Sequence, residues 1–238
     1  MRSATDGAPS FVFVPGLAAA GDELVFDGDE AHYLRRVVRV RAGESVTASD
    51  GDGTLADLVM LEAGPVVRAE VRATRRVESA RRLEVWCGAP EGDRADWLVE
   101  KLGELGVERL RLVDCERGRW EKAVQKADRW DRLALAAMRQ SQSAFRMRVD
   151  PPAPLAALLA AGRDFQDGYL ADPGGVSFLV CPEALRGPAA AAVGPSGGFS
   201  DAERKLLADS AFMPTRLTAS RLRTETAAVA LAALVLSA

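Results

Sequence analysis

Short apolar runs separated by Gly and Asp turns fill the first third of the chain. They read SFVFV, DELVFDGDEAHYL, ESVTASDGDGTLADLVMLE and PVVRAEVRATRRV. Runs of this length and spacing predict a small β-rich domain over residues 1–78. The Asp-Gly step in ASDGDGT lies between two strand-like runs and predicts a β-hairpin there.

The pattern changes after the polar stretch RRVESARR. Strand-like LEVWCG and VERLRLVD flank a helical pattern, DRADWLVEKLGELG, and a long helix is expected from about Lys122 to Ser141. Strands that alternate with helices predict a parallel α/β sheet. Residues 79–238 are therefore expected to form a second domain of the α/β class.

The first helix of this second domain has recognisable ends. Asp93 is expected to be its N-cap, and Gly106 stands where a residue of left-handed conformation ends a helix. The helical period places four apolar side chains on one face: Trp97, Leu98, Leu102 and Leu105.

The last helical pattern, Ala227 to Leu236, is apolar almost all round. It is too short to span a bilayer, so we expect a buried helix in the core or at a subunit interface. The chain has neither a secretory leader pattern nor a membrane-spanning run, so we expect a cytoplasmic protein without a membrane partner.

Composition fits an ordinary globular protein, with 48% hydrophobic and 27% charged residues. The cysteines Cys87, Cys115 and Cys181 are odd in number and form no C-x-x-C pair. This pattern speaks against a disulfide framework and against a zinc cluster, so no metal is expected.

Basic residues are concentrated in two places, although the formal net charge is -3. The stretch RRVVRVR carries Arg35, Arg36, Arg39 and Arg41, and residues 109–148 hold 11 basic against 5 acidic side chains. Local basic patches on a mildly acidic protein indicate a specific anionic partner. The alternative, that both clusters are solvated faces of helices and strands, remains open.

The stretch VGPSGGFSDAER contains the Gly-x-Ser-x-Gly frame of a hydrolase, centred on Ser196. A serine hydrolase of that fold needs a histidine downstream, but the one histidine, His32, lies far upstream. A Ser-Lys pair would depend on Lys205. A P-loop is also excluded, because the Lys-Ser/Thr after its second glycine is absent.

A glycine loop that leads into a helix is the remaining interpretation of this stretch. Ser200 and Glu203 form a capping box that starts a helix at Asp201. Free N–H groups at such a helix start suit a carboxylate, a phosphate or the edge of a heterocycle. A plain structural turn is the alternative.

Five motifs in order give the chain a family resemblance: AHYLRRVVRVRAGE, EKLGELGVERL, RQSQSAF, VGPSGGFSDAE and RLRTETAA. Their order and spacing resemble the bacterial ribosomal RNA uridine-N3 methyltransferase family of the SPOUT superfamily. The likeness covers nearly the whole chain. It implies a PUA-like β-barrel domain, then a parallel α/β domain with a C-terminal trefoil knot.

The resemblance also implies the activity: S-adenosylmethionine-dependent methylation of a uridine at N3 in small-subunit ribosomal RNA, by a homodimer. Three loops would cradle the cofactor. The residues that the resemblance assigns to it are Leu170, Ala171, Gly194, Pro195, Ser196, Gly197, Gly198, Leu217, Leu222, Arg223 and Thr224.

Catalysis at a uridine N3 requires that an anionic base be stabilised while water is excluded. Arg223 is the first choice for that electrostatic role, and Glu225 for orienting the arginine or accepting the proton. The alternative is that Thr224 or Thr226 caps the last helix, with Glu225 favourable at its positive end.

RNA contacts are expected on both domains. The residues assigned to them are His32, Arg35, Arg36, Arg39, Arg117, Gln140 and Ser141. The RNA partner would be small-subunit ribosomal RNA or the assembled subunit.

The sequence departs from the family pattern at three points. Ser196 stands where Glu is usual, Ala219 lies in RLTASRLR where L-G-x-R-I-L-R is usual, and Arg139 precedes Gln140 where Glu or Lys is common. Two alternatives therefore stay open: an RNA-binding protein of this fold without turnover, and a methyltransferase with a different RNA target.

Overall fold

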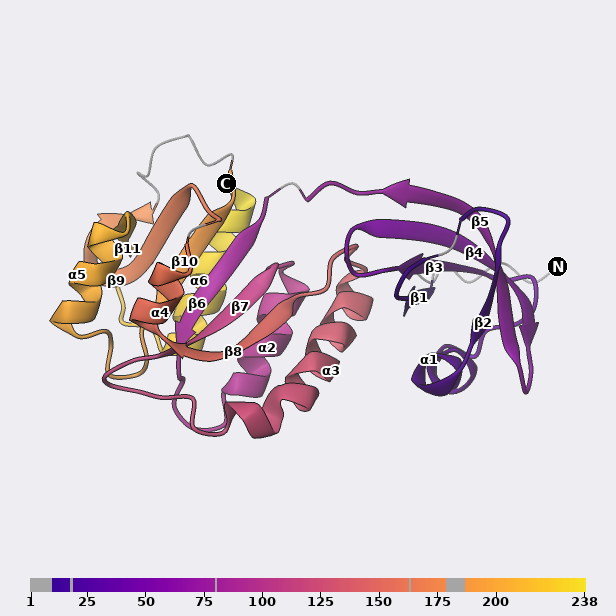
Figure 1. The fold of residues 1–238 in the computed structure, drawn as a ribbon, viewed down its shortest axis with the longest axis horizontal. Helices are drawn as coiled ribbons and strands as arrows, with labels where there is room; N and C mark the ends of the chain where they lie inside the picture. Colours follow the sequence, from indigo (N-terminus) through magenta and orange to yellow (C-terminus); the bar gives the residue numbers. More distant parts are fainter. Residues whose placement is uncertain (1–9, 18, 80, 163, 179–186) are drawn as a thin grey trace. The chain divides into compact units, whose positions relative to one another are not determined.

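The computed structural model describes residues 10–238 except 18, 80, 163 and 179–186 (Figure 1). The chain divides into two compact units. Met1–Ser79 and Met138–Phe145 form the first unit, and Ala80–Ala137 with Arg146–Ala238 form the second. Residues 138–145 thus group with the first unit although they follow most of a long helix of the second.

The first unit is built on a five-stranded sheet with the order β1-β3-β4-β5-β2. Only β1 and β3 pair in parallel among these neighbours. The strands are β1 (Ser10–Phe13), β2 (Glu23–Phe26), β3 (Ser45–Ser49), β4 (Thr54–Ala63) and β5 (Val67–Arg76). Antiparallel pairing of β3 with β4 confirms the hairpin predicted at ASDGDGT.

A helical segment lies between β2 and β3. It consists of α1 (Gly28–His32) and a π-helical turn, η1 (Tyr33–Val38). Leu34 is buried in the core of the unit, together with Val12, Val46 and Leu58 from the sheet. The segment is thus anchored by Leu34, while most of its charged residues stay exposed.

The second unit holds a six-stranded sheet with the order β11-β9-β10-β6-β7-β8, in which every pairing is parallel. Its strands are β6 (Leu83–Gly88), β7 (Arg109–Asp114), β8 (Arg148–Pro154), β9 (Asp167–Ser177), β10 (Ala189–Val193) and β11 (Phe212–Arg216). The parallel α/β sheet is therefore confirmed. The trefoil knot stays a prediction, because strand pairing does not trace how the chain is threaded.

Helices cover both faces of this sheet: α2 (Ala95–Glu104), α3 (Ala123–Ser141), α4 (Leu155–Ala160), α5 (Asp201–Asp209) and α6 (Thr224–Ser237). Successive residues of a strand point to opposite faces. Val85 and Cys87 of β6 accordingly pack in one core with α2, α3 and α6, whereas Trp86 packs in another with residues of α4 and α5. The ring of Trp86 contacts Phe165 and Phe212 there.

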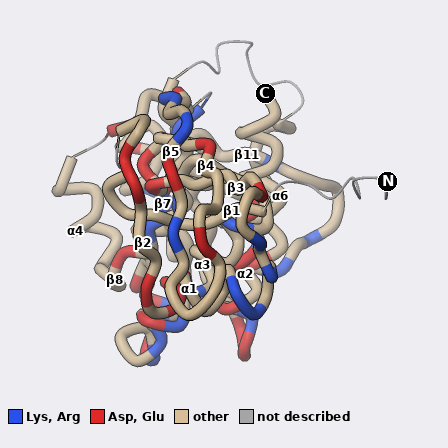
Figure 2. Tube along the Cα trace, turned by 90° about the vertical axis from the view of Figure 1, so that its right-hand side faces the viewer, with Lys and Arg blue, Asp and Glu red and all other residues tan. Residues whose placement is uncertain are grey.

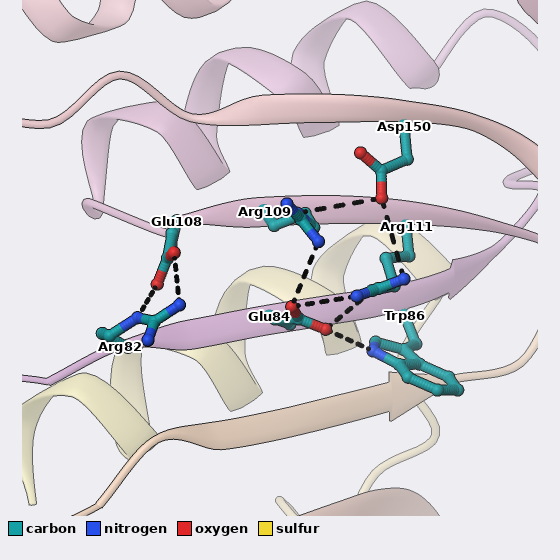
Figure 3. Close-up of polar contacts among 7 residues, drawn as sticks. All are labelled: Arg82, Glu84, Trp86, Glu108, Arg109, Arg111 and Asp150. Atoms are coloured by element: carbon teal, nitrogen blue, oxygen red, sulfur yellow. Dashed lines mark hydrogen bonds and ion pairs between the residues drawn. The ribbon is translucent and has the colours of Figure 1, made fainter. Parts of the chain in front are cut away.

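A network of charged side chains lies on the Trp86 face of β6 and β7 (Figure 3). Glu84 accepts hydrogen bonds from Arg111 Nε at 2.7 Å and from Trp86 Nε1 at 3.2 Å. Arg109 Nη1 lies 3.7 Å from Glu84 Oε1. Arg109 Nε and Arg111 Nη1 each lie 3.8 Å from Asp150 Oδ2. Opposite charges meet within the sheet, so these arginines are neutralised by their own chain.

Helix α2 differs from expectation at its N-terminus. Arg94, not Asp93, is the N-cap, and Leu98 N donates to its carbonyl oxygen at 3.0 Å. Trp97 is 40% exposed while Leu98 is buried, because consecutive helical residues are rotated by about 100° around the axis. Gly106, with φ +81°, ends the helix in the left-handed region as predicted.

The apolar C-terminal helix predicted from Ala227 onward is α6, and residues such as Leu231 and Val235 are fully buried. None of the described helices combines the length and apolarity needed to cross a membrane.

Cys87 and Cys115 are free, buried thiols, and Cys181 lies outside the described residues. Burial raises the pKa of both thiols, that of Cys115 to about 12. In the described part of the chain, no three His, Cys, Asp or Glu side chains are grouped to hold a metal ion.

Candidate functional site

A pocket of about 1070 Å³ lies at the carboxyl ends of the parallel strands β9, β10 and β11. Three segments supply most of its wall: residues 170–173, 193–199 and 215–225. Ligands in open α/β sheets bind at the carboxyl ends of the strands. The pocket is therefore the candidate functional site of the second unit.

The first wall is an irregularity in β9. Leu170 pairs with Pro214 of β11, but the next pair is Val176 with Thr215, so residues 171–175 bulge out of the sheet. Asp172 closes the bulge, since its Oδ1 accepts from Gly174 N at 2.8 Å. Leu170 is buried and Ala171 half-buried, and both line the pocket.

The second wall is the glycine loop, Gly194–Gly198, between β10 and α5. Pro195 is buried and packs closely against Gly88 and Gly118. A Cβ on either glycine would collide with it. Gly198 has φ +72°, which favours glycine. Ser196 and Gly197 are exposed on the pocket side. Pro195 thus fixes the loop against the protein, whereas Ser196 and Gly197 face the pocket.

Helix α5 starts at Asp201 with the capping box that the sequence predicts. Ser200 Oγ accepts from Glu203 N at 3.2 Å, and Glu203 Oε2 accepts from Ser200 N at 2.8 Å. The glycine loop therefore leads directly into a well-capped helix.

The nucleophile interpretation of Ser196 finds neither a histidine nor a lysine among the residues that line this pocket. Lys205 Nζ donates to Asp209 Oδ2 at 2.7 Å on the exposed side of α5. His32 belongs to the first unit. A serine hydroxyl without a base is a weak nucleophile, so the pocket does not support hydrolysis through Ser196.

The third wall runs from β11 into α6. Arg223 is the N-cap of α6 and is exposed, whereas Glu225 in the first turn is only 5% exposed. Thr224 Oγ1 donates to Gly194 O at 3.0 Å, so this side chain fastens the helix start to the glycine loop. The alternative that Thr224 or Thr226 caps α6 is wrong, since Arg223 is the N-cap and both threonines lie inside the helix, although Glu225 does lie in the first turn.

Every residue that the sequence assigns to the cofactor or to catalysis lines this pocket, namely Leu170, Ala171, Gly194, Pro195, Ser196, Gly197, Gly198, Leu217, Leu222, Arg223, Thr224 and Glu225. Leu217 and Leu222 are half-buried and supply apolar surface. Segments that are well separated in the sequence thus meet around one space.

Arg204 is a pocket residue that the sequence analysis missed. Its Nη1 donates to Asp172 Oδ2 at 2.8 Å, and its Nε donates to Phe199 O at 3.3 Å. The arginine therefore joins the β9 bulge to the end of the glycine loop. The sequence shows Arg204 directly after the capping box. No local pattern indicates its partner Asp172, which lies 32 residues away.

The residues expected to contact RNA are distributed over both units. Arg35, Arg36 and Arg39 are exposed along η1 and just after it, and His32 is exposed at the end of α1. Arg39 has φ +59°, which is uncommon for a residue other than glycine. Basic and acidic positions are interspersed along the trace in Figure 2.

Gln140 and Ser141, also expected to contact RNA, belong to the first unit. Gln140 is exposed, and Ser141 Oγ donates to Met138 O at 3.4 Å. The neighbouring Arg139 pairs with Glu30 and lies over the ring of Tyr33, 4.5 Å from its centroid. Arg139 therefore holds this segment against α1 and η1.

Arg117, the remaining predicted RNA contact, lies beside the glycine loop. Its Nη1 donates to Gly197 O at 3.3 Å and to Phe199 O at 3.5 Å. Most of the other basic residues between 109 and 148 have a carboxylate partner: Arg109, Arg111, Lys126, Arg129, Arg139 and Arg146.

Comparison with known proteins agrees with this architecture. Residues 77–236 match the RNA methyltransferase domain family, and residues 26–65 match the RNA methyltransferase PUA domain. The chain belongs to this family of RNA methyltransferases, which confirms the resemblance noted in the sequence. The two-part fold expected from that resemblance, a PUA-type domain before a parallel α/β domain, is confirmed as well.

Two curated relatives carry the name ribosomal RNA small subunit methyltransferase E. The one from Mycobacterium tuberculosis is 31% identical over 244 residues, covering 91% of this chain and 87% of the relative. The one from Bacillus subtilis is 28% identical and covers 84% of each chain.

Solved structures share the fold. The ribosomal RNA small subunit methyltransferase E from Neisseria gonorrhoeae, bound to S-adenosylmethionine, has a TM-score of 0.83 at 24% identity and covers 95% of this chain and 96% of its own. A predicted RNA methyltransferase from Thermotoga maritima has a TM-score of 0.65 at 26% identity and covers 95% and 97%.

Proposed function

We propose that this protein transfers a methyl group from S-adenosylmethionine to N3 of a uridine in small-subunit ribosomal RNA. One observation carries the proposal: the three loops that the resemblance assigns to the cofactor, far apart in sequence, form the walls of a single pocket. Residues 79–238 act as the methyltransferase domain and residues 1–78 as an RNA-binding domain.

The residues of the pocket fit S-adenosylmethionine. Leu170, Leu217 and Leu222 offer apolar surface to an adenine ring. The glycine loop presents backbone groups at close range, and a side chain on Gly194 would come within 2.8 Å of Phe199 N. S-adenosylmethionine supplies an electrophilic methyl group on a sulfonium centre. The volume of about 1070 Å³ leaves room for a target base beside it.

Two residues of the third wall supply the chemistry of the target base. Loss of the imide proton leaves a negative charge on the uracil, and the exposed guanidinium of Arg223 stabilises that charge. Arg223 also stands at the N-terminus of α6, whose dipole favours an anion. The buried Glu225 carboxylate orients the arginine or accepts the proton.

RNA is held by contacts with the first unit. His32, Arg35, Arg36 and Arg39 contribute, with Gln140 and Ser141 beside them in the same unit. The partner is small-subunit ribosomal RNA, free or in the assembled subunit.

The protein acts as a cytoplasmic homodimer. Helix α6 supports this, since Val229, Leu234 and Leu236 remain only half-buried within one chain. Apolar surface that is contiguous on one helix marks an interface in many proteins. Sedimentation equilibrium at micromolar concentration tests the dimer, and a monomeric mass would contradict it.

The decisive experiment is a methyl-transfer assay on small ribosomal subunits that lack this methylation, with the modified base identified by nuclease digestion and mass spectrometry. We expect 3-methyluridine. Methylation of another nucleotide would indicate a different RNA target. Binding of cofactor and RNA without turnover would indicate an RNA-binding protein of this fold. Calorimetry with S-adenosylmethionine that shows no binding would refute the cofactor assignment.

Variants of the glycine loop separate the cofactor role from the nucleophile role. Ser196→Ala should change cofactor affinity little, because the backbone of the loop does the binding. Gly197→Val should weaken it severely, since an added Cβ alone would lie 3.1 Å from Arg117 Cβ. Ser196→Glu, which restores the residue usual in the family, should be tolerated. Ester hydrolysis lost only in Ser196→Ala would contradict the assignment.

A further inference from the structure

The loop that follows β7 contacts the glycine loop but is not part of the pocket wall. It is a tight turn in which Cys115 N donates to Gly118 O at 2.9 Å and Gly118 N donates to Cys115 O at 3.3 Å. A Cβ on Gly118 would lie 2.7 Å from Pro195 Cβ, so the two loops touch. This turn therefore limits where the glycine loop can lie.

Glu203 joins the two loops through a buried carboxylate. The residue is only 6% exposed, and its Oε2 completes the capping box by accepting from Ser200 N. Its Oε1 accepts from Glu116 N, in the turn after β7, at 2.9 Å. A capping box needs only the first of these bonds. The second connects the start of α5 to a strand end 87 residues away in the sequence.

Arg117 connects the turn after β7 to the glycine loop by two further hydrogen bonds. Its guanidinium donates to the carbonyl oxygen of Gly197, within the glycine loop, and to that of Phe199, the residue that follows the loop. Arg204 donates to the same Phe199 carbonyl from the pocket side. Two arginines thus hold the Phe199 carbonyl, although neither Glu203 nor Arg117 lines the pocket.

We infer that Glu203 and Arg117 are positioning residues, which hold the glycine loop in the conformation that binds S-adenosylmethionine. The inference rests on the proposed function. Neither residue lines the pocket, so both act through the backbone of residues 194–199. It gives Arg117 a role different from the RNA contact expected from its sequence.

The experiment measures two affinities for each variant: S-adenosylmethionine by calorimetry and a small-subunit RNA fragment by fluorescence anisotropy. Arg117→Ala should weaken cofactor binding about tenfold, the effect of losing a hydrogen bond from a charged group. RNA affinity should change less than about twofold. Arg117→Lys keeps a cationic donor and should recover part of the loss. The KM for the cofactor should rise while kcat stays within about twofold.

Ser200→Ala is the matched control for Glu203→Gln. Both variants damage the capping box, so both should lower the melting temperature. Glu203→Gln leaves one amide oxygen for two N–H donors, so the bond from Glu116 N must compete with the bond from Ser200 N, whereas Ser200→Ala leaves both oxygens of Glu203 in place. We therefore expect about tenfold weaker cofactor binding in Glu203→Gln and nearly unchanged binding in Ser200→Ala.

Three results would overturn the inference. They are unchanged cofactor affinity in Arg117→Ala, a loss of RNA affinity alone in that variant, and equal losses of cofactor affinity in Ser200→Ala and Glu203→Gln. Failure of the parent protein to bind S-adenosylmethionine is a different result, because it contradicts the proposed function itself.

Discussion

Two arginine-rich segments look alike in the sequence but differ in the structure. Arg35, Arg36 and Arg39 are exposed along a π-helical turn, and the described ion pairs include none of them. In the segment from Arg109 to Arg148, by contrast, six of the eleven basic residues pair with carboxylates of the same protein. Among the described ion pairs, no carboxylate neutralises the first segment, although Arg35 donates to the carbonyl oxygens of Ala31 and Pro65. Most cations of the second segment instead pair with carboxylates that join elements of the fold.

The difference has a physical cause. Charge available to a partner depends on which carboxylates fold next to each cation, and Glu84 and Asp96 come from outside the basic segment. The basic count of a segment therefore overestimates its attraction for RNA when the acids lie elsewhere in the chain. Arg117 illustrates a third outcome, because carbonyl oxygens of the glycine loop accept its hydrogen bonds.

The largest expected effect comes from removing the exposed arginines of the first segment. The triple variant R35A/R36A/R39G should weaken RNA binding about 100-fold, taking ~1 kcal/mol for each exposed phosphate contact. Glycine is used at position 39 because φ there is +59°. The slope of log K against log salt should fall by about 2 for single-stranded RNA. Cofactor affinity is the control, and an unchanged salt slope would show that the cluster is only a solvated surface.

Next in size is the effect of unpairing an arginine of the second segment. Glu84→Gln leaves Arg111, whose side chain is 14% exposed, without its main partner. We expect the free energy of unfolding in urea to fall by about 2 kcal/mol. Glu108→Gln is the matched control, since its partner Arg82 is half exposed, and the loss there should stay below about 1 kcal/mol. Equal losses in the two variants would contradict this account.

A smaller effect is expected for Arg129→Ala. This arginine donates to Asp96 Oδ2 at 2.7 Å and is mostly exposed. The variant should lower stability by less than about 1 kcal/mol and should change RNA affinity less than about twofold. Anisotropy titrations beside the triple variant check the second part. A loss of RNA affinity comparable to that of the triple variant would contradict the proposed difference in RNA binding between the two segments.

The smallest effect concerns pH. Burial raises the pKa of Asp96, but hydrogen bonds from Trp130 and Arg129 outweigh it and hold the pKa below its ordinary value of 3.8. A lowered folded-state pKa contributes stability above the unfolded value that is lost as pH falls through the folded value. Acid unfolding below pH 4 should therefore begin at a higher pH in Asp96→Asn than in the parent, with Asp93→Asn as an exposed control.

Much of the fold could be predicted because it follows from local patterns. The hairpin at ASDGDGT, the capping box of Ser200 and Glu203, and the buried helix α6 each depend on residues a few positions apart. The N-cap of α2 was misplaced by one residue, at Asp93 instead of Arg94, because a sequence pattern does not locate the first helical hydrogen bond. The roles of the pocket residues remain predictions, although all of them lie in one pocket.

The sequence by itself determined the alternation of strands and helices, the glycine loop and the motifs that mark the family, since these depend on residue type and short spacing. Only the tertiary structure decided that Glu203 reaches Glu116 N, that Arg204 reaches Asp172, and which arginines stay free. Hydrogen bonds and ion pairs act over a few ångströms in space. Their partners are therefore fixed by how the chain folds, and no spacing along the sequence encodes them.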